Sequence, residues 1–139
     1  MTLSGEQLLG WRRLMLAIPS NGHGQAADLD WLLDLAGGLC WRQLQELRLH
    51  PQRPVRLERP LGELESLWRR HRSSGEPLQY LVGLCPWRDL EIAVAPGVLI
   101  PRQETELLID LALELLPAPA TDAPVLWADL GTEIGRAHV

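Results

Sequence analysis

The spacing of apolar residues changes along this chain, and that change constrains the fold more than any other feature. Up to about residue 75, apolar residues recur at steps of three and four, which is typical of helices that bury one face. Further on, Leu90, Ile92 and Val94 alternate with other residues, as they do in a half-buried strand. The sequence therefore predicts a helical first part followed by a strand-rich one.

Four helices are expected in the first part. The first begins after Ser4, which forms a capping box with Gln7, and ends before Pro19. The next three are expected at about residues 28–36, near 41–49, and from 61 to a stop at Ser73-Ser74-Gly75. Together they would make a small all-α unit.

Two expectations concern the packing of this first part. The proline-bearing stretch of residues 51–60 should be extended and exposed. Four tryptophans should pack in the core rather than serve as ligand platforms. They are Trp11, Trp31, Trp41 and Trp68.

The strand-rich part contains clear turn residues. A hairpin turn is expected between Trp87 and Leu90, and Pro96-Gly97 fits the central positions of a type II turn. Residues 98–100 should be extended again. Residues 102–116 should form a one-sided helix, with an acidic row of Glu106, Asp110 and Glu114 at steps of four.

Four short segments carry a resemblance to a known enzyme family. They are PLQYLVG from Pro77, VLIPR from Val98, ETE from Glu104 and DLGT from Asp129. In this order and spacing, the chain resembles the peptide chain release factor N5-glutamine methyltransferases, the HemK/PrmC family. The Pro-Arg-x-Glu-Thr-Glu segment is the most specific, because a lone Asp-x-Gly occurs in many α/β proteins.

The resemblance implies an α/β fold in three parts. Residues 1–75 would be an all-α helical bundle that docks the protein substrate, and residues 76–101 a β-hairpin connector. Residues 102–132 would be the truncated start of a Rossmann-like, S-adenosylmethionine-dependent methyltransferase domain. The family transfers a methyl group from S-adenosylmethionine to a glutamine side chain of a peptide chain release factor, so that factor is the implied partner.

A short apolar run from Val125 to Leu130 predicts the first strand of that domain, followed by a glycine turn. Such a turn lets backbone amides approach a ligand, and the next helix N-terminus attracts a carboxylate. The resemblance assigns S-adenosylmethionine binding to this turn, through Asp129, Gly131 and Thr132.

A second set of residues would wall the active site. By the resemblance they are Pro101, Arg102, Glu104, Thr105 and Glu106, and position 103 is Gln where the family usually has Pro. From the residues alone, the two glutamates would only favour the positive end of the helix, and Arg102 would pair with one of them. Both interpretations stay open.

The end of the chain departs from the family pattern. That pattern continues Gly-Thr-Gly-x-Gly, whereas Glu133 follows Thr132 here and would repel the carboxylate of the methyl donor. We expect residues 133–139 to be a non-native tail, because GAG ATC GGA AGA GCA CAC GTC encodes them and looks like sequencing-library adapter. The family's Asn-Pro-Pro-Tyr loop is absent from the 139 residues, so no catalytic residue is assigned and we expect no turnover by this chain alone.

Composition excludes several other classes. A net charge of −5 disfavours general nucleic-acid binding, and the chain lacks an apolar run of about eighteen residues that would span a membrane. The start does not resemble a secretory signal, so a cytoplasmic location is expected. Cys40, Cys85 and four scattered histidines do not form a metal motif, and packed, reduced thiols are expected.

Two other functions stay open. One is an adenine-N6 DNA or RNA methyltransferase, which uses a similar loop to bind an amine. The acidic net charge and the segments at 77–83 and 101–106 argue against it. A non-enzymatic helical interaction module would need only the residues before about Gly75. The cluster Arg69, Arg70 and Arg72 is compatible with a docking patch for an acidic surface or, more simply, with a solvated helix end.

Overall fold

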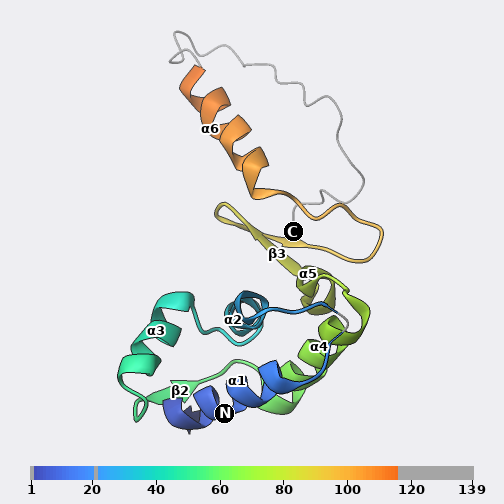
Figure 1. Ribbon diagram of the computed structural model, residues 1–139. Coiled ribbons are helices and arrows are strands. Elements are labelled where there is room, and N and C mark those ends of the chain that lie inside the picture. Colours follow the sequence, from blue (N-terminus) through green and yellow to red (C-terminus); the bar gives the residue numbers. More distant parts are fainter. Residues whose placement is uncertain (1, 21, 116–139) are drawn as a thin grey trace. The chain divides into compact units, whose positions relative to one another are not determined.

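The computed structural model describes residues 2–20 and 22–115, and its contacts divide the chain into two units, Met1–Val82 and Gly83–Val139 (Figure 1). The described residues combine helices with two antiparallel two-stranded sheets, in agreement with a mixed α and β class. The predicted strand at Val125–Leu130, the glycine turn after it and the tail at 133–139 lie outside the described residues.

The first unit contains all four predicted helices and one more. Its elements are β1 (Thr2–Ser4), α1 (Gly5–Ala17), α2 (Ala26–Leu35), α3 (Trp41–Leu49), β2 (Pro54–Arg56), α4 (Leu61–Ser74) and α5 (Leu78–Val82). The short helix α5 was not predicted as a helix, and it packs against α4 and α2.

Helix α1 begins as the sequence predicts. The Ser4 hydroxyl accepts from the Gln7 amide at 3.2 Å, and the Gln7 side chain accepts from the Ser4 amide at 2.8 Å. In the loop after α3, the Pro51 carbonyl accepts a hydrogen bond from the Glu6 amide, and the Arg53 carbonyl accepts one from the Gly5 amide. The first turn of α1 is therefore held by both local and distant partners.

The stretch of residues 51–60 is partly buried. It contains β2, which pairs antiparallel with β1 so that Leu3 lies opposite Val55. Val55 and Leu57 are 4% and 2% exposed, so the prediction that this stretch is exposed is wrong for them. Pairing with β1 turns these alternate side chains into the core.

A single hydrophobic core fills the first unit, and its largest fully buried side chains come from all five helices and from the segment between β2 and α4. They are Trp68, Leu8, Leu29, Leu32, Leu33, Leu44, Leu57, Leu64 and Leu78. Trp11 and Trp68 are buried as predicted, whereas Trp31 and Trp41 are 38% and 65% exposed, so the packing prediction is wrong for those two.

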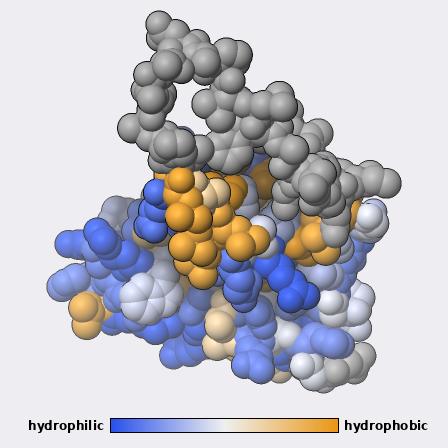
Figure 2. Space-filling view, turned by 90° about the horizontal axis from the view of Figure 1, so that it is seen from above, coloured by the Kyte–Doolittle hydropathy of each residue, from blue (hydrophilic) through white to orange (hydrophobic). Residues whose placement is uncertain are grey.

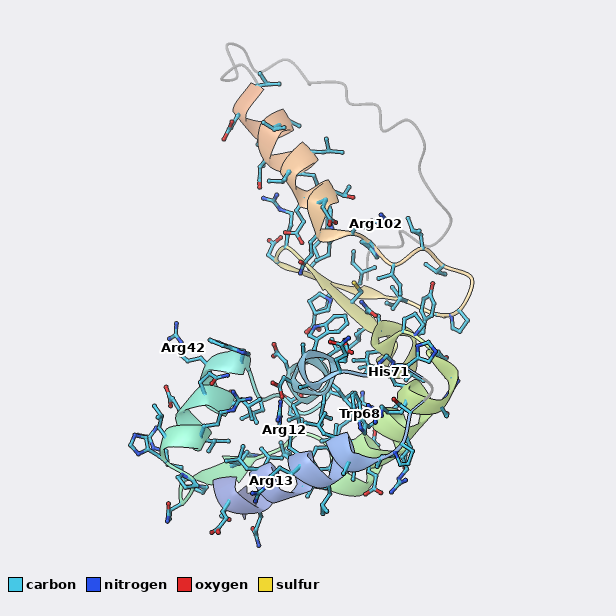
Figure 3. All side chains as sticks on the ribbon, in the orientation of Figure 1. Arg12, Arg13, Arg42, Trp68, His71 and Arg102 are labelled. Atoms are coloured by element: carbon cyan, nitrogen blue, oxygen red, sulfur yellow. The ribbon has the colours of Figure 1, made fainter. Side chains whose placement is uncertain are left out.

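Trp68 and Arg72 of α4 bind the end of α1 and the loop after it. The Trp68 indole donates to the Met15 carbonyl at 2.9 Å, and the Arg72 guanidinium lies 5.6 Å from the Trp68 ring centre. Arg72 also donates to the carbonyls of Ile18 and Gly24. Trp68 and His71 lie one turn apart on α4 (Figure 3).

The arginine cluster at the end of α4 is thus used within the first unit. Arg69 pairs with Glu65, and Arg70 pairs with Glu76 through two hydrogen bonds. With Arg72 bonded to two backbone carbonyls, these three arginines stabilise the helix end and its neighbouring loops.

Gly75 ends α4 as predicted, with φ +70. A side chain there would also meet the His23 ring at 2.9–3.0 Å. Glycine is therefore required both by the left-handed backbone and by the close ring.

The second unit begins with the predicted hairpin. Strand β3 (Leu84–Trp87) pairs antiparallel with β4 (Leu90–Ala93), and Trp87 lies opposite Leu90. The Val98 amide donates to the Ala95 carbonyl at 3.0 Å around Pro96-Gly97, and Gly97 has φ +94, which confirms the type II turn. Residues 98–100 do not form a strand.

The helix expected at 102–116 starts later than predicted. A 3-10 turn, η1 (Gln103–Thr105), precedes α6 (Glu106–Leu115). No residue of α6 is buried, and its leucines 107, 108, 111, 113 and 115 are all exposed. Apolar side chains, orange in Figure 2, reach the molecular surface.

Candidate functional site

The five residues expected to wall an active site form one turn at the start of α6. Arg102 is extended and caps η1, with its carbonyl accepting from the Thr105 amide at 3.1 Å. The Glu106 amide then donates to the carbonyls of Gln103 and Glu104. Arg102 and Glu104 are exposed, while Pro101, Thr105 and Glu106 are half-buried.

The hairpin holds this turn from one side. Trp87, the last residue of β3, is 9% exposed, and its indole donates to the Arg102 carbonyl at 3.2 Å. Because a buried indole N–H needs an acceptor, this bond fixes the backbone where η1 begins. Arg102 itself is labelled in Figure 3.

Arg88, in the hairpin turn, bonds the first turn of α6 at three points. Its amide donates to the Glu106 carboxylate at 3.3 Å. Its guanidinium donates to the Glu106 carbonyl at 3.2 Å and to the Asp110 carboxylate at 2.5 Å. The predicted acidic row is thus real, and Arg88 uses two of its members.

The backbone of Arg88 is strained. It has φ +54, the left-handed region, where a residue other than glycine costs about 1–2 kcal/mol. A positive φ at the first of two central residues matches a type II′ hairpin turn, in which glycine usually occupies that place. The bonds to Glu106 and Asp110 offset this cost, so the turn and the helix start depend on each other.

Arg102 is not paired as the residues alone suggested. Among the described residues its side chain makes no hydrogen bond or ion pair, and neither does that of Glu104. Glu106 bonds Arg88 instead. Within residues 2–20 and 22–115, the turn therefore presents one guanidinium and one carboxylate without a partner.

Cys85 of β3 lies beside this turn. Burial, and then the negative charge of Glu106, raises the pKa of the Cys85 thiol above its ordinary value. Both effects disfavour the thiolate, so Cys85 is a packed, protonated thiol as expected. Cys40 is also reduced, but it is exposed, so the prediction of a packed thiol is wrong there.

Sequence reasoning predicted a functional segment at residues 101–106 but missed the residues that position it. Arg88 lies 18 and 22 residues from its partners, and an isolated Arg-Asp turn carries no sign of a distant contact. The one available indication was the acidic row itself, which needs a cation nearby.

Within the described residues no group of His, Cys, Asp and Glu is arranged to hold a metal. Within the same ranges no helix is long and apolar enough to cross a bilayer. The cofactor-binding residues expected from the resemblance, Asp129, Gly131 and Thr132, fall in the part of the chain that the structure does not describe.

Comparison with known proteins identifies close relatives. No protein-family model matches the chain. It is 50% identical over 98% of its length to a "Release factor glutamine methyltransferase" of Prochlorococcus marinus, of which it covers 45%. It is 40% identical over 94% of its length to a protein of the same name from Gloeobacter violaceus, covering 43% of it.

A third relative with this name, from Thermosynechococcus vestitus, is 38% identical over 99% of the chain, which covers 46% of it. The chain thus spans a little less than half the length of these relatives and matches their N-terminal part. By sequence, the chain is thus similar over nearly its whole length to the N-terminal part of proteins named release factor glutamine methyltransferase.

Proposed function

We propose that the whole protein containing this chain transfers a methyl group from S-adenosylmethionine to the side-chain nitrogen of a glutamine in a peptide chain release factor. The observation that carries the proposal is 50% identity over 98% of the chain to a protein named for that activity. The segment from Pro101 to Glu106, which is the most specific part of the family resemblance, also lies in a single turn that is held in place by other residues.

In this proposal the described residues hold the reactants rather than react. A glutamine amide nitrogen is a weak nucleophile, so it must be held in line with the methyl group, and orientation of this kind can lower a barrier by about 7–11 kcal/mol. Trp87 and Arg88 fix the backbone of the wall, and the free side chains of Arg102 and Glu104 are the groups available to contact the acceptor.

The methyl donor would be bound by the glycine turn of Asp129, Gly131 and Thr132. This assignment rests on the sequence pattern, in which a glycine lets backbone amides approach the amino-acid end of S-adenosylmethionine. The donor supplies the methyl group from its sulfonium. A Rossmann-like domain around that turn is part of the same proposal.

The test is methyl transfer by the protein encoded by the complete reading frame that contains these residues. It is incubated with the release factor of the same genome and S-adenosylmethionine labelled in the methyl group. We expect label in the release factor, lost when the target glutamine, located by mass spectrometry, is replaced by alanine. The 139-residue chain is run in parallel, and we expect it to transfer no label.

The adenine-N6 alternative is tested in the same experiment by adding DNA or RNA. Label in adenine, with none in the release factor, would overturn the proposal. No described contact favours that alternative, and the net charge of −5 opposes the approach of a polyanion.

A further inference from the structure

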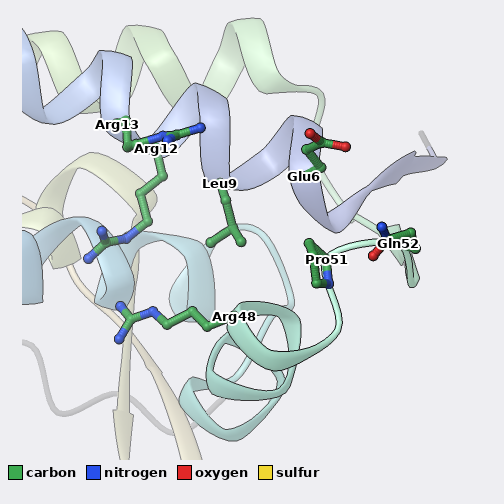
Figure 4. A pocket seen from close by; sticks show the side chains of 7 residues that line it. All are labelled: Glu6, Leu9, Arg12, Arg13, Arg48, Pro51 and Gln52. Carbon is green, nitrogen blue, oxygen red and sulfur yellow. The ribbon is translucent and has the colours of Figure 1, made fainter.

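A groove of about 390 Å³ opens on the first unit between α1 and the loop after α3. Three arginines line it, Arg12 and Arg13 from α1 and Arg48 from α3, together with the apolar side chains of Leu9 and Pro51 (Figure 4). All of these residues belong to one unit, so the groove does not depend on the second.

Two of the arginines share one carboxylate. Arg12 bonds Asp30 through two nitrogens at 2.5 and 2.9 Å, and Arg48 approaches the same carboxylate at 3.5 Å. Asp30 is 13% exposed, so it is well placed to fix both guanidiniums but neutralises only one charge. This trio therefore presents one positive charge in excess at the groove.

Arg13 adds a second positive charge. It is exposed and makes no hydrogen bond or ion pair with other residues in the described ranges. Glu6 is the acidic side chain in the lining. With the Asp30 and Glu6 carboxylates counted, the groove keeps one positive charge in excess, whereas the chain as a whole has a net charge of −5.

The lining also selects between kinds of anionic partner. Guanidiniums bind carboxylates and phosphates alike. Leu9 and Pro51, however, add apolar surface to the lining that suits the side chains of a peptide, and the negative chain as a whole repels an extended polyanion. An acidic peptide segment that carries an apolar residue fits both features.

We propose that this groove docks an acidic, partly apolar segment of the release factor. The proposal rests on the proposed function only for the identity of the partner. Arg13 would meet a partner carboxylate directly, and Arg12, clamped by Asp30, would set the position of the second charge.

The experiment is a binding titration of the 139-residue chain by calorimetry, with the release factor of the same genome as ligand. The decisive variant is Arg13→Glu, and its matched control is Arg42→Glu. Arg42 is also exposed on a helix of the first unit but does not line the groove. Both variants change charge equally, and circular dichroism checks that both stay folded.

We expect Arg13→Glu to weaken binding about tenfold or more, because it sets like charges against each other, while Arg42→Glu changes it by less than about twofold. Equal binding by wild type and both variants would overturn the inference and leave the proposed function standing. So would equal weakening by both variants.

Two further ligands separate the remaining outcomes. An acidic peptide of Glu, Asp and Leu is titrated alongside a single-stranded RNA of equal charge. If the release factor does not bind but the peptide does, in a manner that depends on Arg13, the groove assignment is supported and its partner is refuted. Tighter binding of the RNA, or binding by none of the three, would overturn the proposal.

Discussion

The two units of this chain differ in whether the apolar faces of their helices are buried. In the first unit, leucines at helical spacing from several helices meet in one core, and nine large side chains are fully buried. In the second, the leucines of α6 follow the same spacing but all remain exposed. Helical periodicity thus predicts which side of a helix is apolar, but it does not say whether the described part of the chain supplies a covering element.

This contrast also separates the forces that hold each unit. The first is stabilised mainly by burial, with polar groups such as the Trp68 indole bonded inside the core. In the second, as far as residue 115, a few hydrogen bonds and one ion pair join the hairpin to the helix start. We therefore expect core substitutions to have large effects and substitutions in the hairpin small, local ones.

The largest effect is expected for Trp68→Ala, which should lower the free energy of unfolding by about 3–5 kcal/mol. The side chain is fully buried, and its loss removes the bond to Met15 as well as packing. Urea unfolding followed by circular dichroism measures this. The control is Trp41→Ala at an exposed position, which should change stability by less than about 0.5 kcal/mol. Similar losses in both variants would contradict the position of the core.

A smaller effect is expected for Arg72→Ala. It removes two charge-assisted bonds to loop carbonyls. Each contributes about 1.5–3 kcal/mol when fully buried, but Arg72 is only half-buried and water replaces part of this, so we expect a loss of about 2 kcal/mol. Arg69→Ala, which breaks a surface pair with Glu65, should cost about 0.5 kcal/mol or less in the same unfolding assay. If the two cost the same, Arg72 does not tie the loop.

In the second unit, Arg88→Ala should loosen the start of α6. The ion pair with Asp110 is largely exposed, so its loss should have only a small, local effect. Amide hydrogen exchange at residues 106–110 should accelerate by up to about fivefold, while amides of α2 stay unchanged. Arg88→Gly should exchange more slowly than Arg88→Ala, because glycine removes the strain at φ +54. The opposite order would show that the turn is not strained.

The smallest effect concerns Cys85. Since burial and Glu106 raise the pKa of its thiol, less thiolate is present at a given pH, and alkylation by iodoacetamide should reach half its plateau rate at a higher pH than for a free cysteine. The measurement uses a Cys40→Ser background. Glu106→Gln should move that midpoint to lower pH, and an unchanged midpoint would exclude the charge effect.

Much of the first unit follows from its sequence. The cap at Ser4, the stop at Gly75 and the four helices depend on neighbouring residues, so local patterns predict them. The burial of Val55 could not be predicted in this way, because it depends on pairing with a strand some fifty residues earlier. The exposure of Trp41 has the same cause: its surroundings are set by the packing of whole helices.

In the candidate site, too, local features were predictable from the sequence and distant contacts were not. The order of Pro101 to Glu106 and their place at a helix start were predictable from the motif, whereas the roles of Trp87 and Arg88 were not. Those roles depend on a hairpin folding back onto the turn. The spacing of residues in a motif predicts local structure, but it does not predict which distant loop will contact that motif.

The pairing of β1 with β2 has a consequence for how this chain is made. Leu3 has no strand partner until Val55 has emerged from the ribosome. The Met15 carbonyl gains its hydrogen bond later still, when Trp68 emerges. At about 5–20 residues per second, the first helix spends several seconds with its apolar side uncovered. Closure of the unit therefore waits until α4 has been synthesised, and the apolar side of the first helix is open to chaperones during that interval.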